Sequence, residues 1–92
     1  MKFVLGEIVA TSGVVDKMVH DRAFGDFVSK SFNRYVDCDW GELDELDIKS
    51  NTEALHKQER IFGAYTSDND EKIWIITEWD RSVTTILFPH EY

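Results

Sequence analysis

The order of apolar and polar positions divides the chain into a strand, a helical middle and a β-rich end. Residues 2–11 alternate with the two-residue period of a strand, although Glu7 interrupts one of the apolar faces. The residues Thr11, Ser12 and Gly13 then indicate a turn. The hydroxyl of either Thr11 or Ser12 is expected to cap the helix that follows.

The middle of the chain carries the spacing of three helices. A short helix is predicted around residues 14–19, and Asp21 is the expected N-cap of a second helix. That second helix would bury one aromatic stripe, formed by Phe24, Phe27, Val28 and Phe32. A third helix is predicted from about Asp44 to Glu59, with its apolar positions at Leu43, Leu46, Ile48 and Leu55.

The last third of the chain predicts strands over residues 60–67, 72–79 and 82–88, which are rich in β-branched and aromatic side chains. Short polar connections join them, so they form an antiparallel meander that Pro89 ends. The expected class is α+β, a single domain over residues 1–92 with helices packed on one face of the sheet. The first strand is left with two possible places, at an edge of the sheet or between meander strands.

The charge balance restricts the kind of partner. Eighteen acidic and ten basic residues give a net charge of -8, which repels nucleic-acid phosphates and attracts basic protein surfaces. Direct nucleic-acid binding is therefore disfavoured, although an acidic excess also serves solubility alone. The single cysteine permits no internal disulfide, and no apolar run is long enough to span a membrane, so a cytoplasmic protein is expected.

The densest feature is a run of six carboxylates within eleven residues that contains no lysine or arginine. Its members are Asp37, Asp39, Glu42, Asp44, Glu45 and Asp47. One interpretation is a surface that imitates nucleic-acid phosphates and occupies a basic channel of a nucleic-acid-binding enzyme. The alternative is that acids at the start of the third helix complement its dipole.

Metal binding and catalysis find less support. Cys38, His20 and His56, with His90, are candidate ligands for a structural zinc ion, but none has the local spacing of a zinc motif. Surface roles are the alternative for these histidines. Because the chain also lacks a local nucleophile motif and a phosphate-binding glycine loop, we expect a protein that is not an enzyme.

Two tryptophans are candidate partner contacts. Trp79 lies beside the Asp80-Arg81 turn, where a large side chain is expected to be partly exposed. Trp40 lies within the acidic run, and it serves either as a core anchor for the loop, which is the favoured reading, or as a contact for a partner.

Two stretches resemble a family of short bacterial proteins labelled plasmid-related proteins, found on plasmids, phages and other mobile elements. They are residues 39–45, Asp-Trp-Gly-Glu-Leu-Asp-Glu, and residues 72–89, which begin Lys-Ile-Trp-Ile-Ile-Thr-Glu. The likeness extends to residues 8–11 and 61–65. This chain departs from the family pattern at Cys38, at Trp79 and in the composition of residues 16–26.

The resemblance implies a bacterial mobile-element context without a defined activity. Small acidic proteins of such elements are recurrently inhibitors of host defence, which leads to the hypothesis of an anti-CRISPR-like protein. It would bind a CRISPR effector nuclease through the acidic run and hinder the loading of target DNA. The alternative is a non-inhibitory accessory or regulatory module of plasmids and phages that interacts through the aromatic residues of the meander.

Overall fold

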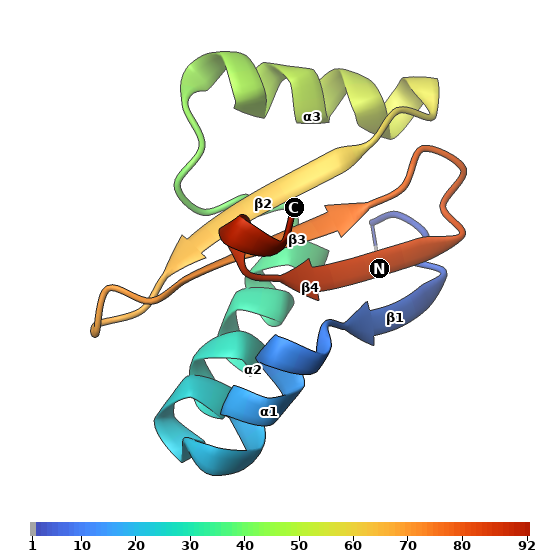
Figure 1. Cartoon of the computed structure of the whole chain (residues 1–92). Helices are drawn as coiled ribbons and strands as arrows, with labels where there is room; N and C mark the ends of the chain where they lie inside the picture. Colours follow the sequence, from blue (N-terminus) through green and yellow to red (C-terminus); the bar gives the residue numbers. More distant parts are fainter. Residues whose placement is uncertain (1) are drawn as a thin grey trace.

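The computed structural model describes residues 2–92 and confirms the α+β class and the predicted order of elements. The elements are β1 (Glu7–Ala10), α1 (Ser12–His20), α2 (Arg22–Val36), α3 (Glu45–Lys57), β2 (Ile61–Thr66), β3 (Lys72–Thr77), β4 (Val83–Leu87) and the short 3-10 helix η1 (Pro89–Glu91). Figure 1 shows the strands as one sheet, with α1 and α2 as a pair on one side and α3 apart from them.

The sheet has the strand order β1-β4-β3-β2. The pairs β2–β3 and β3–β4 are antiparallel, which confirms the predicted meander. β1 lies at the edge and runs parallel to β4, with Glu7 opposite Val83 and Ala10 opposite Ile86. The first strand thus takes the edge position, which leaves β1 and β2 as the two outer strands.

β1 is shorter than the strand predicted over residues 2–11. Gly6 has a φ of 67°, and a Cβ at this position would lie 2.4 Å from the backbone oxygen of Arg81. The chain therefore turns at Gly6, and the residues before it leave the sheet. Phe3 packs instead against the ring of Tyr35, with ring centroids 5.5 Å apart.

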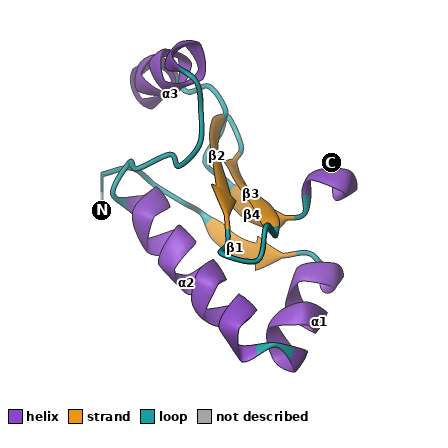
Figure 2. Cartoon of the chain, turned by 90° about the vertical axis from the view of Figure 1, so that its left-hand side faces the viewer, coloured by secondary structure: helices purple, strands orange, loops and turns teal. Residues whose placement is uncertain are grey.

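α1 and α2 form the helical layer beside the sheet (Figure 2). The Thr11 hydroxyl accepts a hydrogen bond from the N–H of Val14, so Thr11 is the N-cap of α1, and Asp21 caps α2 as predicted. The aromatic stripe of α2 faces the core: Phe24 and Val28 are buried, and Phe27 and Phe32 pack against the core half-buried. Among residues 2–92, no helix is both long and apolar enough to cross a membrane.

A chain of buried hydroxyl groups joins α2 to the centre of the sheet. The Tyr35 hydroxyl lies 2.7 Å from that of Thr77, which lies 2.7 Å from that of Thr84, which donates to the backbone oxygen of Leu5 at 2.7 Å. Burial raises the pKa of Tyr35 above its ordinary value, so the hydroxyl stays protonated and can donate. This chain fixes α2 against β3 and β4.

α3 packs in a different way from the predicted one. Its buried residues are Asn51 and Ala54, whereas Leu46 is 79% exposed and Ile48 is 42% exposed. Of the four apolar positions predicted for this helix, Leu43 and Leu55 pack against the core, whereas Leu46 and Ile48 do not. The helix lies along β2, as Figures 1 and 2 both show. Besides Ala54 and Leu55, which pack in the core, one polar side chain attaches it to the backbone of that strand.

That side chain is Asn51, which binds the outer edge of β2. Its Nδ2 donates to the backbone oxygen of Phe62 at 2.6 Å, and its Oδ1 accepts from the N–H of Phe62 at 3.2 Å. An edge strand exposes such groups unless another element covers them. Asn51 therefore both positions α3 and protects this edge of the sheet.

Candidate functional site: an acidic surface

The six carboxylates of the acidic run all lie exposed between the end of α2 and the first turn of α3. We call them the acidic surface: Asp37, Asp39, Glu42, Asp44, Glu45 and Asp47. The first is the C-cap of α2, and the last two lie in the first turn of α3. The connection between α2 and α3, together with the first turn of α3, therefore presents all six.

The backbone of this loop is fixed by hydrogen bonds to β2. The N–H of Glu42 donates to the backbone oxygen of Ala64 at 2.7 Å, and the N–H of Ala64 donates to the backbone oxygen of Trp40 at 3.1 Å. These bonds form a single parallel bridge between Gly41 and Ala64. The loop is thus attached to the sheet at the point where its carboxylates are displayed.

Gly41 is the residue that makes this attachment possible. Its φ of 75° lies in the left-handed region, and a Cβ at this position would lie 2.0 Å from the backbone oxygen of Ala64. Any side chain would therefore separate the loop from β2.

Trp40 fixes the loop from the inside. It is only 6% exposed, and its ring meets that of Tyr35 edge-on with centroids 5.5 Å apart. The Tyr65 hydroxyl adds a hydrogen bond of 2.8 Å to the backbone oxygen of Asp39. The burial of Trp40 fits the core-anchor interpretation, and its side chain is not presented to a partner in this structure.

Two of the six carboxylates have local structural roles. Asp39 accepts two hydrogen bonds from the guanidinium of Arg34, at 2.8 and 3.2 Å, and these bonds hold the pKa of Asp39 below its ordinary value. Asp44 caps α3 by accepting from the N–H of Asp47 at 2.8 Å. Arg34 in turn lies over the Tyr65 ring, 5.2 Å from its centroid, which limits its movement.

The helix dipole accounts for part of the remaining charge. Glu45 and Asp47 lie at the N-terminus of α3, where negative charge is stabilising, as the structural alternative predicted. Asp37 has the opposite position, at the C-terminus of α2, where the dipole disfavours a carboxylate. Among residues 2–92, Asp39 is the one member of the acidic surface whose carboxylate forms an ion pair, and Lys2 donates to the backbone oxygen of Asp37 at 3.2 Å.

The zinc prediction does not fit the structure. Within residues 2–92, no three His, Cys, Asp or Glu side chains are close enough together to hold a metal ion. Cys38 lies after α2, and burial raises the pKa of its thiol, which disfavours the thiolate that zinc requires. His20 lies on α1 with its Nδ1 2.8 Å from the backbone oxygen of Asp16, and His56 lies in the last turn of α3. The three candidates do not form a metal site.

Trp79 is exposed, as expected, but it does not belong to the acidic surface. Its side chain is 61% exposed on the turn between β3 and β4. Arg81 of the same turn donates to the backbone oxygens of Ala54 and Glu59, so this turn lies beside the C-terminal end of α3. The acidic surface lies at the N-terminal end, and the length of α3, about 20 Å, separates the two.

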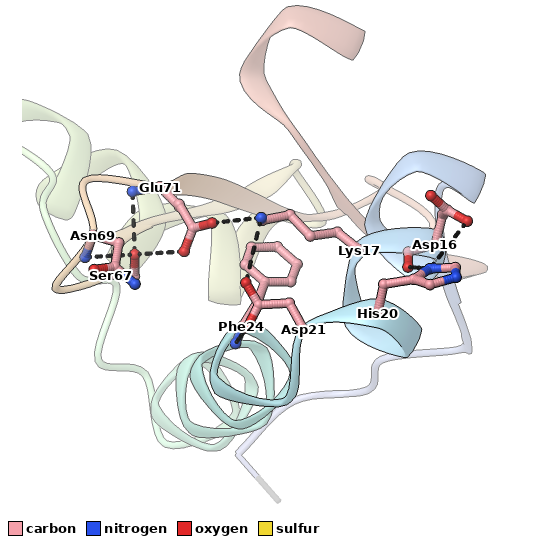
Figure 3. A network of polar contacts seen from close by, with 8 residues as sticks. All are labelled: Asp16, Lys17, His20, Asp21, Phe24, Ser67, Asn69 and Glu71. Carbon is pink, nitrogen blue, oxygen red and sulfur yellow. Dashed lines mark hydrogen bonds and ion pairs between the residues drawn. The ribbon is translucent and has the colours of Figure 1, made fainter.

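The structure also shows a polar network that the sequence pattern did not indicate (Figure 3). Lys17 of α1 forms ion pairs with Glu71 at 2.8 Å and with Asp21 at 3.5 Å. Glu71 also accepts from the Ser67 hydroxyl at 3.1 Å. The network joins α1 and α2 to the β2–β3 turn, beside a hollow of about 500 Å³ whose charged lining contains both signs. Because Lys17 meets both Asp21 and Glu71 in Figure 3, we assign the network a structural role.

A second feature lies on the sheet face opposite α2. Phe62 and Trp74 pack edge to face with centroids 5.1 Å apart, and Tyr92 packs on Trp74 at 5.6 Å. With Arg60 and Ile76, these aromatic residues line a hollow of about 270 Å³. Trp74 and Ile76 lie two residues apart on β3 and therefore share a face, whereas the part played by Tyr92 depends on the fold of the C-terminus.

Comparisons with known proteins add no assignment: no family model, no curated protein and no solved structure matches this chain. The resemblance to plasmid-related proteins therefore stays a prediction. The candidate site rests on the geometry of the acidic surface.

Proposed function

We propose that this protein is an anti-CRISPR-like inhibitor that binds a basic surface of a CRISPR effector nuclease through the acidic surface. Bound there, it hinders the loading of target DNA. The mobile-element context implied by the sequence resemblance supports this choice of target. It also accords with the net charge of -8, which favours basic protein surfaces over nucleic acid.

The observation that carries the proposal is a rigid loop that displays exposed carboxylates. Trp40 and Gly41 hold the backbone against the core and β2, so the loop loses little conformational freedom when a partner binds. Asp39 is the member of the acidic surface that forms an ion pair within the described residues, and Lys2 donates to the backbone oxygen of Asp37, which leaves the carboxylates of Glu42, Glu45 and Asp47 available to lysine and arginine of a partner. A groove that binds DNA presents such cations along its length.

The position of Asp37 adds a second line of support. A carboxylate at the C-terminus of α2 costs stability, because it meets the negative end of the helix dipole. Lys2 offsets part of that cost by donating to the Asp37 backbone oxygen at 3.2 Å, and a basic partner would offset more of it. Natural proteins tend to depart from local stability rules where function requires it.

The experiment is capture of a purified effector nuclease, loaded with its guide, by the tagged protein at low and at moderate salt, followed by target cleavage. We expect capture that weakens as salt rises, since screening shortens the reach of exposed charges, together with reduced cleavage. Undiminished cleavage and no capture across several effector types would refute the proposed target.

The aromatic face of the sheet favours a second candidate function, an accessory module that binds through apolar contacts. Phe62, Trp74 and Tyr92 with Arg60 form a cluster of the residue types enriched at interface hot spots. Binding through this face would survive high salt because apolar contacts are not screened. A Trp74→Ala variant would then lose its partner, whereas neutralising the acidic surface would leave that binding unchanged.

A further inference from the structure

The two edges of the sheet differ in how far other groups cover their backbone. The outer edge of β2 is covered at Phe62 by the Asn51 side chain and at Ala64 by the loop that contains Trp40 and Glu42. β1 is the other outer strand, and Figure 1 shows its outer side facing away from α3 and from the rest of the sheet. β1 is short and begins with the exposed Glu7, both of which limit the addition of a strand, but among the hydrogen bonds of residues 2–92 no side chain covers its outer backbone as Asn51 covers β2.

The backbone of β1 offers hydrogen-bonding groups to a further strand. The N–H groups of Glu7 and Thr11 donate to the backbone oxygens of Ser82 and Ile86, both at 3.0 Å. In a parallel pair, the backbone N–H and C=O groups of every second residue point toward the neighbouring strand. The N–H and C=O groups of Ile8 and Ala10 therefore point outward, away from β4.

An apolar groove of about 380 Å³ runs along this edge on the helical side of the sheet. Its lining contains no charged and no polar side chain: Ile8, Val9, Ala10, Val15, Met18, Val19, Val28 and Ile86. Three of these residues are well exposed, Val19 at 73%, Ile8 at 51% and Val15 at 46%. Contiguous apolar exposure next to an open edge is characteristic of an interaction surface.

We propose that the β1 edge and its groove bind a second copy of this chain, with the two β1 strands antiparallel about a two-fold axis. Pairing Ile8 of each copy with Ala10 of the other satisfies all four outward groups on each strand and places Val9 opposite Val9. The two four-stranded sheets then form one continuous sheet. The axis stands perpendicular to that sheet, so both grooves lie on the same side and close against each other.

The charge distribution favours a second copy over other occupants. Each chain carries a net charge of -8, so two copies repel one another wherever their acidic residues meet. The groove lacks such residues, which allows close approach of like-charged copies, and it offers no carboxylate to a basic partner. The acidic surface lies beyond the opposite edge of the sheet, so the dimer would present two acidic surfaces at its far ends.

The test is sedimentation equilibrium of the full chain over roughly a hundredfold range of concentration, because a small interface associates weakly and by mass action. We expect a monomer–dimer equilibrium that strengthens as added salt screens the mutual repulsion. A Val19→Asp variant should raise the dissociation constant at least about tenfold, since it places a charge in each groove. The matched control Leu46→Asp changes an equally exposed apolar residue on α3 and should leave the equilibrium unchanged.

A second measurement does not depend on any variant. Amide hydrogen exchange of Ile8 and Ala10 should slow as the concentration of the unchanged protein rises, because dimerisation gives both N–H groups an acceptor. A monomer at every concentration would overturn the proposal and leave the edge to a strand of another protein. An equal effect of the Val19 and Leu46 variants would also overturn it, and so would exchange at Ile8 that does not depend on concentration.

Discussion

Removing the Asn51 side chain tests how α3 and the acidic surface are held on the sheet. Asn51 is 3% exposed and makes two hydrogen bonds to Phe62, one at 2.6 Å and one at 3.2 Å. Asn51→Ala removes both partners at once and leaves the N–H and C=O of Phe62 beside an apolar methyl group. No other side chain of α3 binds the β2 backbone among the hydrogen bonds of residues 2–92.

The size of the effect follows from the two unsatisfied groups. Leaving a buried donor or acceptor without a partner costs about 1–3 kcal/mol each. Water entering at the edge of the sheet recovers part of this, so we expect a loss of about 2–4 kcal/mol in the free energy of unfolding. For a domain of this size, each kcal/mol lowers Tm by about 4–8 °C, which makes a fall of at least ~8 °C the expected result.

The assay is urea unfolding followed by circular dichroism, with hydrogen exchange at the Phe62 amide as a local measure. Thr52→Ala is the matched control, because Thr52 is the next residue of α3 and bonds only to the oxygen of Ile48 in its own helix. That variant should change the free energy of unfolding by less than about 0.5 kcal/mol. A loss below about 0.5 kcal/mol for Asn51→Ala, with unchanged exchange at Phe62, would refute this account of how α3 is attached.

Two further predictions concern the loop itself. Gly41→Ala should lower the free energy of unfolding by roughly 1–3 kcal/mol or more, because it combines a left-handed backbone with a Cβ 2.0 Å from the Ala64 oxygen. Urea unfolding measures this loss, and an unchanged stability would contradict the bridge between the loop and β2. Arg34→Gln should cost up to about 1 kcal/mol at neutral pH, since the ion pair with Asp39 is half exposed. The pKa of Asp39 is lowered in the folded state, so this contribution is present above the ordinary carboxyl pKa and is lost as pH falls through the lowered pKa. If the difference in free energy of unfolding between the unchanged protein and the Arg34→Gln variant grew as the pH became acidic, the predicted pH dependence would be contradicted.

The elements that could be predicted from the sequence are those set by local chemistry. The cap at Asp21 and the stripe of Phe24 and Val28 depend on residues three or four positions apart, and both are found as expected. The meander follows in the same way from alternation and short connections. The parallel pairing of β1 with β4 joins residues more than seventy positions apart, as Glu7 with Val83, and no local pattern specifies it.

The sequence predicts the acidic run as a charged segment, but it does not predict which of the apolar residues around the run are exposed and which are buried. Leu46 and Ile48 satisfy a helical pattern, yet they are exposed, because the side of α3 that faces the protein carries Asn51, Ala54 and Leu55 instead. Burial of Trp40 likewise depends on Tyr35 and Phe3, which lie elsewhere in the chain. The separation of Trp79 from the acidic surface follows from the direction of α3, which composition does not determine.

The most direct test of the central claim compares two triple variants in a target-cleavage assay with the effector nuclease and its guide. Glu42→Gln, Glu45→Gln and Asp47→Asn together remove three charges from the acidic surface and spare Asp39 and Asp44, which have structural roles. The matched variant changes Asp26, Asp68 and Asp70 to asparagine and removes the same charge from exposed positions elsewhere. The account predicts that the first variant loses inhibition while the second inhibits like the unchanged protein, with both folded by circular dichroism. Equal inhibition by both variants would show that the acidic surface is not the contact.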